Sequence, residues 1–342
     1  MAVTIKDLAR AAGVSHTTVS RALHDNPALS KDTIVRVKEL AEKMGYVPNA
    51  TARGLKTRRT LTLGVIVAHI DDPFWSEVMH GVDDVLHQAG YSFFVSATHR
   101  DAKREKEIVR VMEQRGVDGV ILLAPQFAPE QALQMKRYGL PMAIVNNEGA
   151  GEYDYLIYND DVYGIQLVTR HLTELGHTKI AFLGNQQGGS TNSERLRGFL
   201  EFMQTAHLSV RDGYVHNAAT SSLEDGFAGA KVLLSQVNRP TAIVCYNDNM
   251  AVGVFRAAAE AGLRIPQDLS VTGFDDISIA AYLNPPLTTL HQHKYNLGSG
   301  AAQMMLEVLE QKRTSAGALP PPKKVGLKGE LVIRGSTAVP GG

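Results

Sequence analysis

The chain has 342 residues, with 35 basic and 35 acidic side chains, one cysteine, and no apolar run near the roughly 18 residues that a membrane-spanning helix needs. Its polar N-terminus does not resemble a signal peptide. These features exclude a disulfide-stabilised secreted protein and a transmembrane protein, and they predict a cytoplasmic protein with no membrane partner.

Residues 1–45 predict a three-helix bundle that contains a helix-turn-helix. Thr4 is a suitable N-cap for a first helix that Gly13 ends, and Ser15 begins a second helix almost at once. A third helix follows between Ser30 and Gly45. In a helix-turn-helix, the second helix enters the major groove of DNA with its N-terminus first. The outward-facing residues of that helix are His16, Thr17, Ser20 and Arg21.

Basic charge is concentrated at this end of the chain. Residues 1–60 contain eleven Lys and Arg but five Asp and Glu, so they carry a net charge of +6 and leave −6 for residues 61–342. A polyanion is therefore attracted to one end only. A purely structural three-helix bundle would share the caps and apolar stripes but would not need this charge, so we expect DNA binding.

Residues 46–60 predict a hinge helix and linker. Pro48 breaks the backbone, and residues 50–56 give barely two turns, far below the roughly 12 to 15 residues that an isolated helix needs in water. We therefore expect this segment to fold only against a partner. Leu55 is a large apolar side chain among basic ones, and such a side chain can wedge between base pairs in the minor groove. The alternative is a simple basic tether.

These segments together resemble the lactose-repressor/galactose-repressor (LacI/GalR) family. The resemblance rests on Thr4-Ile5-Lys6-Asp7-Leu8-Ala9, Gly13-Val14-Ser15, Thr18-Val19-Ser20-Arg21-Ala22-Leu23, Gly45-Tyr46-Val47-Pro48-Asn49 and Ala52-Arg53-Gly54-Leu55. It implies a homodimer, in some members a tetramer, that binds a pseudo-palindromic operator with Leu55 of each subunit at its centre. The expected DNA-binding residues are Thr4, Ser15, His16, Thr17, Ser20, Arg21, Asn49, Ala52, Leu55 and Lys56.

Residues 61–342 predict an α/β ligand-binding and dimerisation domain with two doubly wound lobes of the periplasmic-binding-protein type. Nearly continuous Val, Ile and Leu runs between helical stretches are typical of parallel strands covered on both faces. We expect the first lobe at about 61–158 and 291–322, and the second at about 159–290 and 323–338, with a hairpin-like stretch up to Arg334. The predicted strands are Leu61–Val67, Tyr91–Ala97, Gly119–Ala124, Met142–Val145, Lys179–Gly184, Ala242–Tyr246 and Leu269–Phe274.

The residues just after these strands are rich in carboxylates, amides, guanidinium groups and aromatic rings. Ligands of such sheets bind at the carboxyl ends of the strands. Polar groups of this kind can bind pairs of hydroxyls while rings cover C–H faces, so a polyhydroxylated ligand is expected. The resemblance places most of them in the family's inducer cleft. The expected ligand-binding residues are Asp72, Phe74, Arg100, Asn146, Thr191, Arg195, Ser221, Asn247, Asp275 and Gln292.

Simpler roles compete for some of these residues. A lone Asp or Asn can cap a helix, as we consider for Asp248 and Asp276. Arg195 can instead pair with Glu194 or Glu201.

Two positions depart from the pocket of lactose-type members. Ser221 replaces an aromatic residue that often stacks on the sugar, and Lys294 replaces an apolar or aromatic residue. An additional cation beside Arg100 and Arg195 favours a carboxylated or phosphorylated ligand, unless a neighbouring acid neutralises it. The identity of the sugar therefore stays open.

No motif in the sequence indicates catalysis, a cofactor or a metal. There is no nucleophile elbow, Walker loop or paired Cys/His spacing, and the Asp-Asp pairs at 71–72, 160–161 and 275–276 lack a consistent ligand spacing. A transport protein would not need the basic N-terminal segment. We therefore predict a repressor, not an enzyme, whose operator affinity a sugar-like inducer lowers. The alternative is a co-repressor that strengthens DNA binding.

Overall fold

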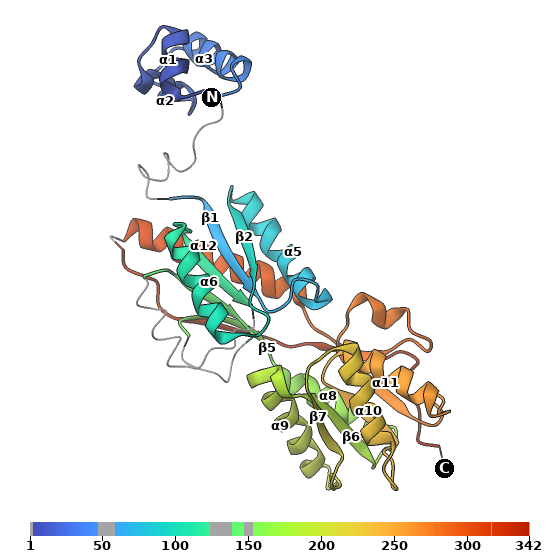
Figure 1. Ribbon diagram of the computed structural model, residues 1–342. Helices are drawn as coiled ribbons and strands as arrows, with labels where there is room; N and C mark the ends of the chain where they lie inside the picture. Colours follow the sequence, from blue (N-terminus) through green and yellow to red (C-terminus); the bar gives the residue numbers. More distant parts are fainter. Residues whose placement is uncertain (1–2, 47–58, 124–138, 147–152, 316, 342) are drawn as a thin grey trace. The chain divides into compact units, whose positions relative to one another are not determined.

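The computed structural model of the chain describes residues 3–46, 59–123, 139–146, 153–315 and 317–341 (Figure 1). The chain separates into two compact units, Met1–Thr60 and Leu61–Gly342. The first unit is helical where it is described, and the second contains two parallel-type sheets with helices on both faces. The predicted α/β fold class is confirmed.

The N-terminal unit is a bundle of three helices, α1 (Ile5–Ala12), α2 (His16–Ala22) and α3 (Lys31–Lys43). The N-caps predicted at Thr4, Ser15 and Ser30 are confirmed, because each hydroxyl accepts a hydrogen bond from the backbone N–H three residues later. Gly13 ends α1 with a φ of 65°, a conformation that glycine adopts without strain. The buried core consists of Leu8, Ala9, Ala12, Val19, Ala22, Val37 and Ala41.

The first lobe contains a six-stranded sheet in the order β11-β5-β4-β3-β1-β2, and all neighbouring strands are parallel. Helices α5 and α12 pack on one face of this sheet and α6 packs on the other. The elements are β1 (Thr62–Val67), α5 (Pro73–Gln88), β2 (Ser92–Ala97), α6 (Ala102–Gln114), β3 (Gly119–Leu123), β4 (Met142–Val145), β5 (Tyr155–Asn159), α12 (Lys294–Thr314) and β11 (Lys323–Leu327).

The second lobe contains a six-stranded sheet in the order β12-β10-β9-β8-β6-β7, in which only β12 runs antiparallel to its neighbour. Helices α10 and α11 pack on one face, and α8 and α9 pack on the other. The elements are α8 (Asp161–Glu174), β6 (Ile180–Asn185), α9 (Gly189–Thr205), β7 (Val215–Ala218), α10 (Leu223–Leu234), β8 (Ala242–Cys245), α11 (Asp248–Glu260), β9 (Ser270–Asp275), β10 (Thr288–His291) and β12 (Glu330–Val332).

All seven predicted strands are confirmed to within one residue at each end. The expected hairpin before Arg334 and the placement of 323–327 in the second lobe are wrong. Strand β11 pairs with β5 in the first sheet, while β12 pairs with β10 in the second. Before β11 is added, β5 has no neighbour on its outer side in the first sheet, and β10 has none in the second. The chain fills these two edges in turn, so β11 and β12 do not pair with each other. The chain therefore passes between the lobes after β5, after β10 and after β11.

Candidate functional site

A buried arginine on α9 contacts the ends of several second-lobe elements. The Arg195 side chain donates from Nε to Asp161 Oδ1 at 2.8 Å and from Nη1 to the carbonyl oxygen of Tyr246. Its Nη2 lies 3.9 Å from Asp275 Oδ1. The guanidinium carbon is also 3.8 Å from the centroid of the Phe274 ring. Arg195 and Asp275, both predicted ligand residues, are therefore adjacent at the carboxyl end of β9.

The alternative in which Arg195 pairs with Glu194 or Glu201 is wrong. Both carboxylates pair instead with Arg197, whose side chain is 51% exposed. Two residues along an α-helix correspond to a rotation of about 200°. Arg195 therefore faces the interior of the lobe, while Arg197 faces solvent.

Buried Gln292 connects the ends of one strand from each sheet. Its Nε2 donates to Asp275 Oδ1 at the end of β9, and its Oε1 accepts from Asn159 Nδ2 at the end of β5. Gln292 lies in the crossing between β10 and α12, so these bonds join the two lobes directly. Burial raises the pKa of Asp275 well above its ordinary value, and the positive charge of Arg195 opposes that shift.

Asn146 and Thr191 lie in the wall of one small cavity, together with Asn159 and Asp161. Asn146 Oδ1 accepts a bond from the backbone N–H of Asn159 at 2.9 Å. Among the described residues, the buried Oδ1 of Asn159 accepts no hydrogen bond. An unsatisfied buried acceptor costs about 1–3 kcal/mol, so a ligand hydroxyl would be a favourable donor here. Asn159 is not among the predicted ligand residues, because β5, which ends at Asn159, is not among the predicted strands.

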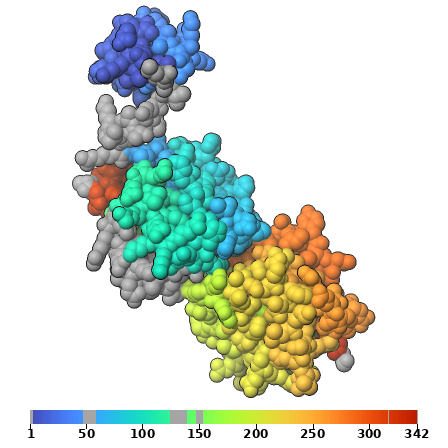
Figure 2. All heavy atoms as spheres, in the orientation of Figure 1, coloured from blue at the N-terminus to red at the C-terminus, as the bar shows by residue number. Residues whose placement is uncertain are grey.

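The first-lobe residues have different surroundings. Arg100 donates from Nη1 to the carbonyl oxygen of Gln187 at 2.7 Å, across the contact between the first lobe and the yellow-to-orange second lobe in Figure 2. Asp72 is the N-cap of α5 and accepts from the N–H of Phe74 at 3.0 Å, and burial raises the pKa of its carboxyl. The Phe74 ring packs edge-on against Trp75 in the first-lobe core.

Two other predicted ligand residues lie at helix starts in the second lobe. Asn247 is the N-cap of α11, and its Oδ1 accepts from the N–H of Met250 at 3.0 Å. Ser221 is half-buried and precedes Ser222, the N-cap of α10. The side-chain oxygen of Asn247 is therefore used as a helix cap, the simpler role that we consider for such residues. Asn247 follows Tyr246, whose carbonyl oxygen Arg195 contacts.

Asp248 is not the helix cap that we considered, since Asn247 takes that role. Its side chain is fully buried and accepts bonds from the backbone N–H of Ile277 at 2.8 Å and from Thr289 Oγ1. Gly273 on β9 makes room for it, because a Cβ there would lie 2.0 Å from Asp248 Oδ1. Burial raises the pKa of Asp248 from 3.8 to about 6.

Five of the six aspartates considered as cation ligands accept hydrogen bonds within the protein, and Asp71 is the one for which no such bond is found in the described part of the chain. Asp276 accepts from Arg334 Nη2 at 2.7 Å and contacts His291 Nδ1 at 3.0 Å, so it too is not a helix cap. Within the ranges that the structure describes, no group of three or more His, Cys, Asp or Glu is arranged to hold a metal ion. Nor does any helix in those ranges have the length and apolarity needed to cross a membrane.

In the N-terminal unit, α2 exposes His16, Thr17 and Arg21, while Ser20 is half-buried. The hydroxyls of Thr4 and Ser15 accept backbone N–H groups as helix caps. The other four expected DNA-binding residues lie outside the described residues: Asn49, Ala52, Leu55 and Lys56.

The chain matches two family models. Residues 4–49 match the model described as bacterial regulatory proteins, lacI family, and residues 169–337 match a periplasmic binding protein-like domain. The HTH-type transcriptional repressor PurR of Aliivibrio fischeri strain MJ11 is 37% identical over 313 residues, covering 90% of this chain and 92% of that protein. PurR of Haemophilus influenzae strain PittEE is 33% identical over 333 residues, covering 97% and 98%.

Solved structures agree with this assignment. The Lac repressor dimer bound to operator and the anti-inducer ONPF has a TM-score of 0.88 at 26% identity and covers 99% of this chain and 100% of that one. The CelR–cellobiose complex has a TM-score of 0.73 at 25% identity, covering 98% and 99%. The resemblance found in the sequence is confirmed, and the relatives are repressors and not enzymes. The chain belongs to the lacI family of bacterial regulatory proteins, DNA-binding transcriptional repressors with a ligand-binding domain.

Proposed function

We propose that this repressor binds a pseudo-palindromic operator as a homodimer and that a neutral sugar or sugar derivative, bound at Arg195 and Asp275, lowers its affinity for that operator. The observation that carries the effector site is the buried Arg195 guanidinium, which lies between Asp161 and Asp275 where the lobes meet. A guanidinium next to carboxylates offers donors and acceptors in one plane, as a pair of sugar hydroxyls requires.

The charges around Arg195 favour a neutral ligand over an anionic one. Asp161 and Asp275 lie close to it and share its positive charge, and the charge of Asp72 acts on Asp275. Acceptors are in excess, and the unsatisfied Oδ1 of Asn159 adds another. A carboxylate or phosphate would add further acceptors to these groups, whereas hydroxyl groups would supply the missing donors.

Similar structures support a sugar as the effector class. CelR was solved with cellobiose, and a LacI family regulator from Enterococcus faecium, with a TM-score of 0.70 at 26% identity, was solved with ribose. The opposite sign of control, a co-repressor that strengthens operator binding, is the other outcome of the experiment below.

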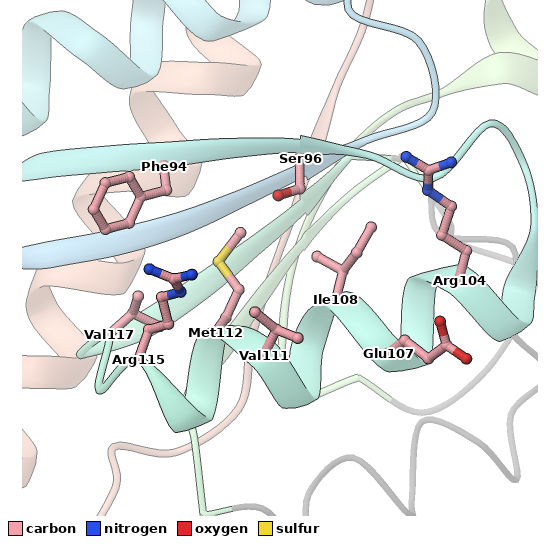
Figure 3. Close-up of a pocket in the computed structure, with 9 residues that line it drawn as sticks. All are labelled: Phe94, Ser96, Arg104, Glu107, Ile108, Val111, Met112, Arg115 and Val117. Atoms are coloured by element: carbon pink, nitrogen blue, oxygen red, sulfur yellow. The ribbon is translucent and has the colours of Figure 1, made fainter.

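An exposed apolar patch supports the homodimer. The hollow in Figure 3 has a volume of about 450 Å³ and lies between edge strand β2 and helix α6. Phe94 on β2 is 57% exposed and Val111 on α6 is 48% exposed, beside Arg104 and Glu107. In a twofold dimer the same patch meets itself, so basic and acidic side chains of the two copies can pair. We assign a second copy of this chain to this face, as the dimeric Lac repressor suggests.

The dimer is tested by sedimentation of a Phe94→Glu variant. The carboxylate would be buried against the second copy, so we expect a monomer that has lost operator affinity. Val237→Glu is the matched control, because Val237 is fully exposed elsewhere in the second lobe. A dimeric Phe94→Glu protein would contradict this assignment.

The effector and its sign are tested in two steps. A thermal-shift screen of neutral sugars, sugar acids and sugar phosphates identifies the ligand, and an operator is selected from random duplex DNA. The ligand is then titrated with and without operator. We expect a neutral sugar whose affinity operator DNA weakens by roughly 5- to 150-fold, since coupling is reciprocal. Tighter binding on operator would establish a co-repressor, and unchanged binding would mean that the site is not coupled.

A further inference from the structure

The side chain of Lys294 is fully used by the protein. Lys294 begins α12 in the first lobe and is 1% exposed. Its Nζ donates to the carbonyl oxygens of Asp275 and Asp276, at 2.7 and 2.9 Å, and lies 3.5 Å from Glu77 Oε2 on α5. An ammonium group has three N–H donors; two are used by these carbonyl oxygens, and the Glu77 carboxylate lies within salt-bridge distance of the same group. The expectation that Lys294 offers an additional cation to the ligand is therefore not supported.

The two carbonyls belong to a strained turn. Asp275 has a φ of 123° and Asp276 a φ of 53°, values that L-residues rarely adopt. Such a backbone persists only where its surroundings fix it. Asp248 accepts the N–H of Ile277 on the far side of the turn, and Lys294 holds the carbonyls on the near side. The Asp275 carboxylate extends from this turn toward Gln292 and Arg195.

We propose that Lys294 is a positioning residue for Asp275, and that it fixes this second-lobe carboxylate relative to the first lobe. Because α12 and Glu77 belong to the first lobe, the turn is anchored to the opposite side of the lobe contact. An apolar side chain at this position would take the Nζ donor away from both carbonyls. The effect on ligand binding rests on the proposed function, whereas the anchoring of the turn does not.

Anchoring is tested without any ligand, by amide hydrogen exchange on the full-length protein. Lys294→Met keeps the length of the side chain and removes its donors, so we expect exchange in residues 274–278 to accelerate by at least about tenfold. Lys312→Met is the matched control, since Lys312 also lies on α12 and donates to one carbonyl, that of Gly139 at 3.1 Å, but is only half-buried. Glu77→Gln keeps both carbonyl bonds and should leave the turn unchanged.

Comparing the exchange rates of the turn, residues 274–278, with those of β6 separates a positioning role of Lys294 from a general effect on stability. If exchange in β6 accelerates as much as in the turn, or if the turn is unchanged in Lys294→Met, the proposal is wrong. Titration with ribose and cellobiose adds the functional arm: where either binds the parent, we expect at least tenfold weaker binding to Lys294→Met and parental binding to Lys312→Met. If neither sugar binds the parent, neither ribose nor cellobiose is the effector, while the exchange result still decides the role of Lys294.

Discussion

Arg195 on α9 forms a salt bridge of 2.8 Å with Asp161, the first residue of α8, and both side chains are buried. Burial raises the pKa of Asp161, and the positive charge of Arg195 opposes that shift. Buried ions of this kind are stable only when both partners are present. Because α8 starts directly after the first passage between the lobes, the same guanidinium that faces Asp275 also fixes the end of that passage.

Replacing Arg195 by Ala should abolish the response to the effector while operator binding persists. Losing the charged hydrogen bonds that Arg195 would donate to a bound ligand costs about 2–5 kcal/mol, equivalent to a loss in ligand affinity of roughly 30-fold or more. Arg197→Ala is the control, because its exposed ion pairs contribute about 0–1 kcal/mol each. Operator binding measured by anisotropy with increasing effector checks this, and a parental response from Arg195→Ala would exclude the site.

Asp248 should make stability depend on pH. Its pKa is raised from 3.8 to about 6, so the folded state binds a proton more tightly than the unfolded state. Its contribution to stability is therefore fully present below about pH 4 and is lost as the pH rises to about 6, by up to ~3 kcal/mol. Asp248→Asn removes this titration. Urea unfolding across the window should give a flatter pH profile for the variant, and parallel profiles would contradict the shift.

Gly298→Ala should destabilise the first lobe. A Cβ at Gly298 on α12 would lie 1.8 Å from the carbonyl oxygen of Val78 on α5, and this backbone atom cannot move aside alone. Overpacking of this kind costs about 1–3 kcal/mol or more. Gly300→Ala on the same helix is the control, since its Cβ would meet only the end of the Ile157 side chain. Denaturant midpoints of the two variants should differ, and equal values would argue against the close helix contact.

Leu55→Ala should weaken binding to operator more than binding to random DNA. Leu55 lies outside the described residues, and the prediction rests on the sequence, where an apolar wedge acts only on DNA that can be kinked. Lys56→Ala should instead weaken both kinds of binding and reduce the salt dependence by about one phosphate contact. Titrations on both DNAs at several salt concentrations separate the two effects. Equal losses for Leu55→Ala on both would rule out a wedge.

Local patterns predicted much of this architecture. The helix caps at Thr4, Ser15 and Ser30 depend on the residues that follow within three positions, so they can be read from sequence. Short runs of Val, Ile and Leu in the sequence predict buried parallel strands. Strand β7, Val-His-Asn-Ala, and strand β10, Thr-Thr-Leu-His, contain polar residues and give no such signal.

The candidate site was predictable from the polar residues that follow the strands and from the family resemblance. Arg195 and Asp275 match family positions, and the structure brings them together. The burial of Asp248 depends on Thr289, 41 residues away, and that of Lys294 depends on carbonyls at the end of another strand. No periodicity in the sequence indicates such contacts, because they join elements that are far apart along the chain and meet only in the folded domain.

The last two strands, β11 and β12, complete different sheets, and this has a consequence for the synthesis of the protein. The first sheet lacks its edge strand until residue 327 has been made, and the second lacks its own until residue 332. The N-terminal unit, by contrast, is contiguous and has its own core, so it can fold while the ribosome is still translating. A nascent chain would thus acquire its DNA-reading helices long before either lobe is complete. Neither lobe can be produced alone as one uninterrupted fragment.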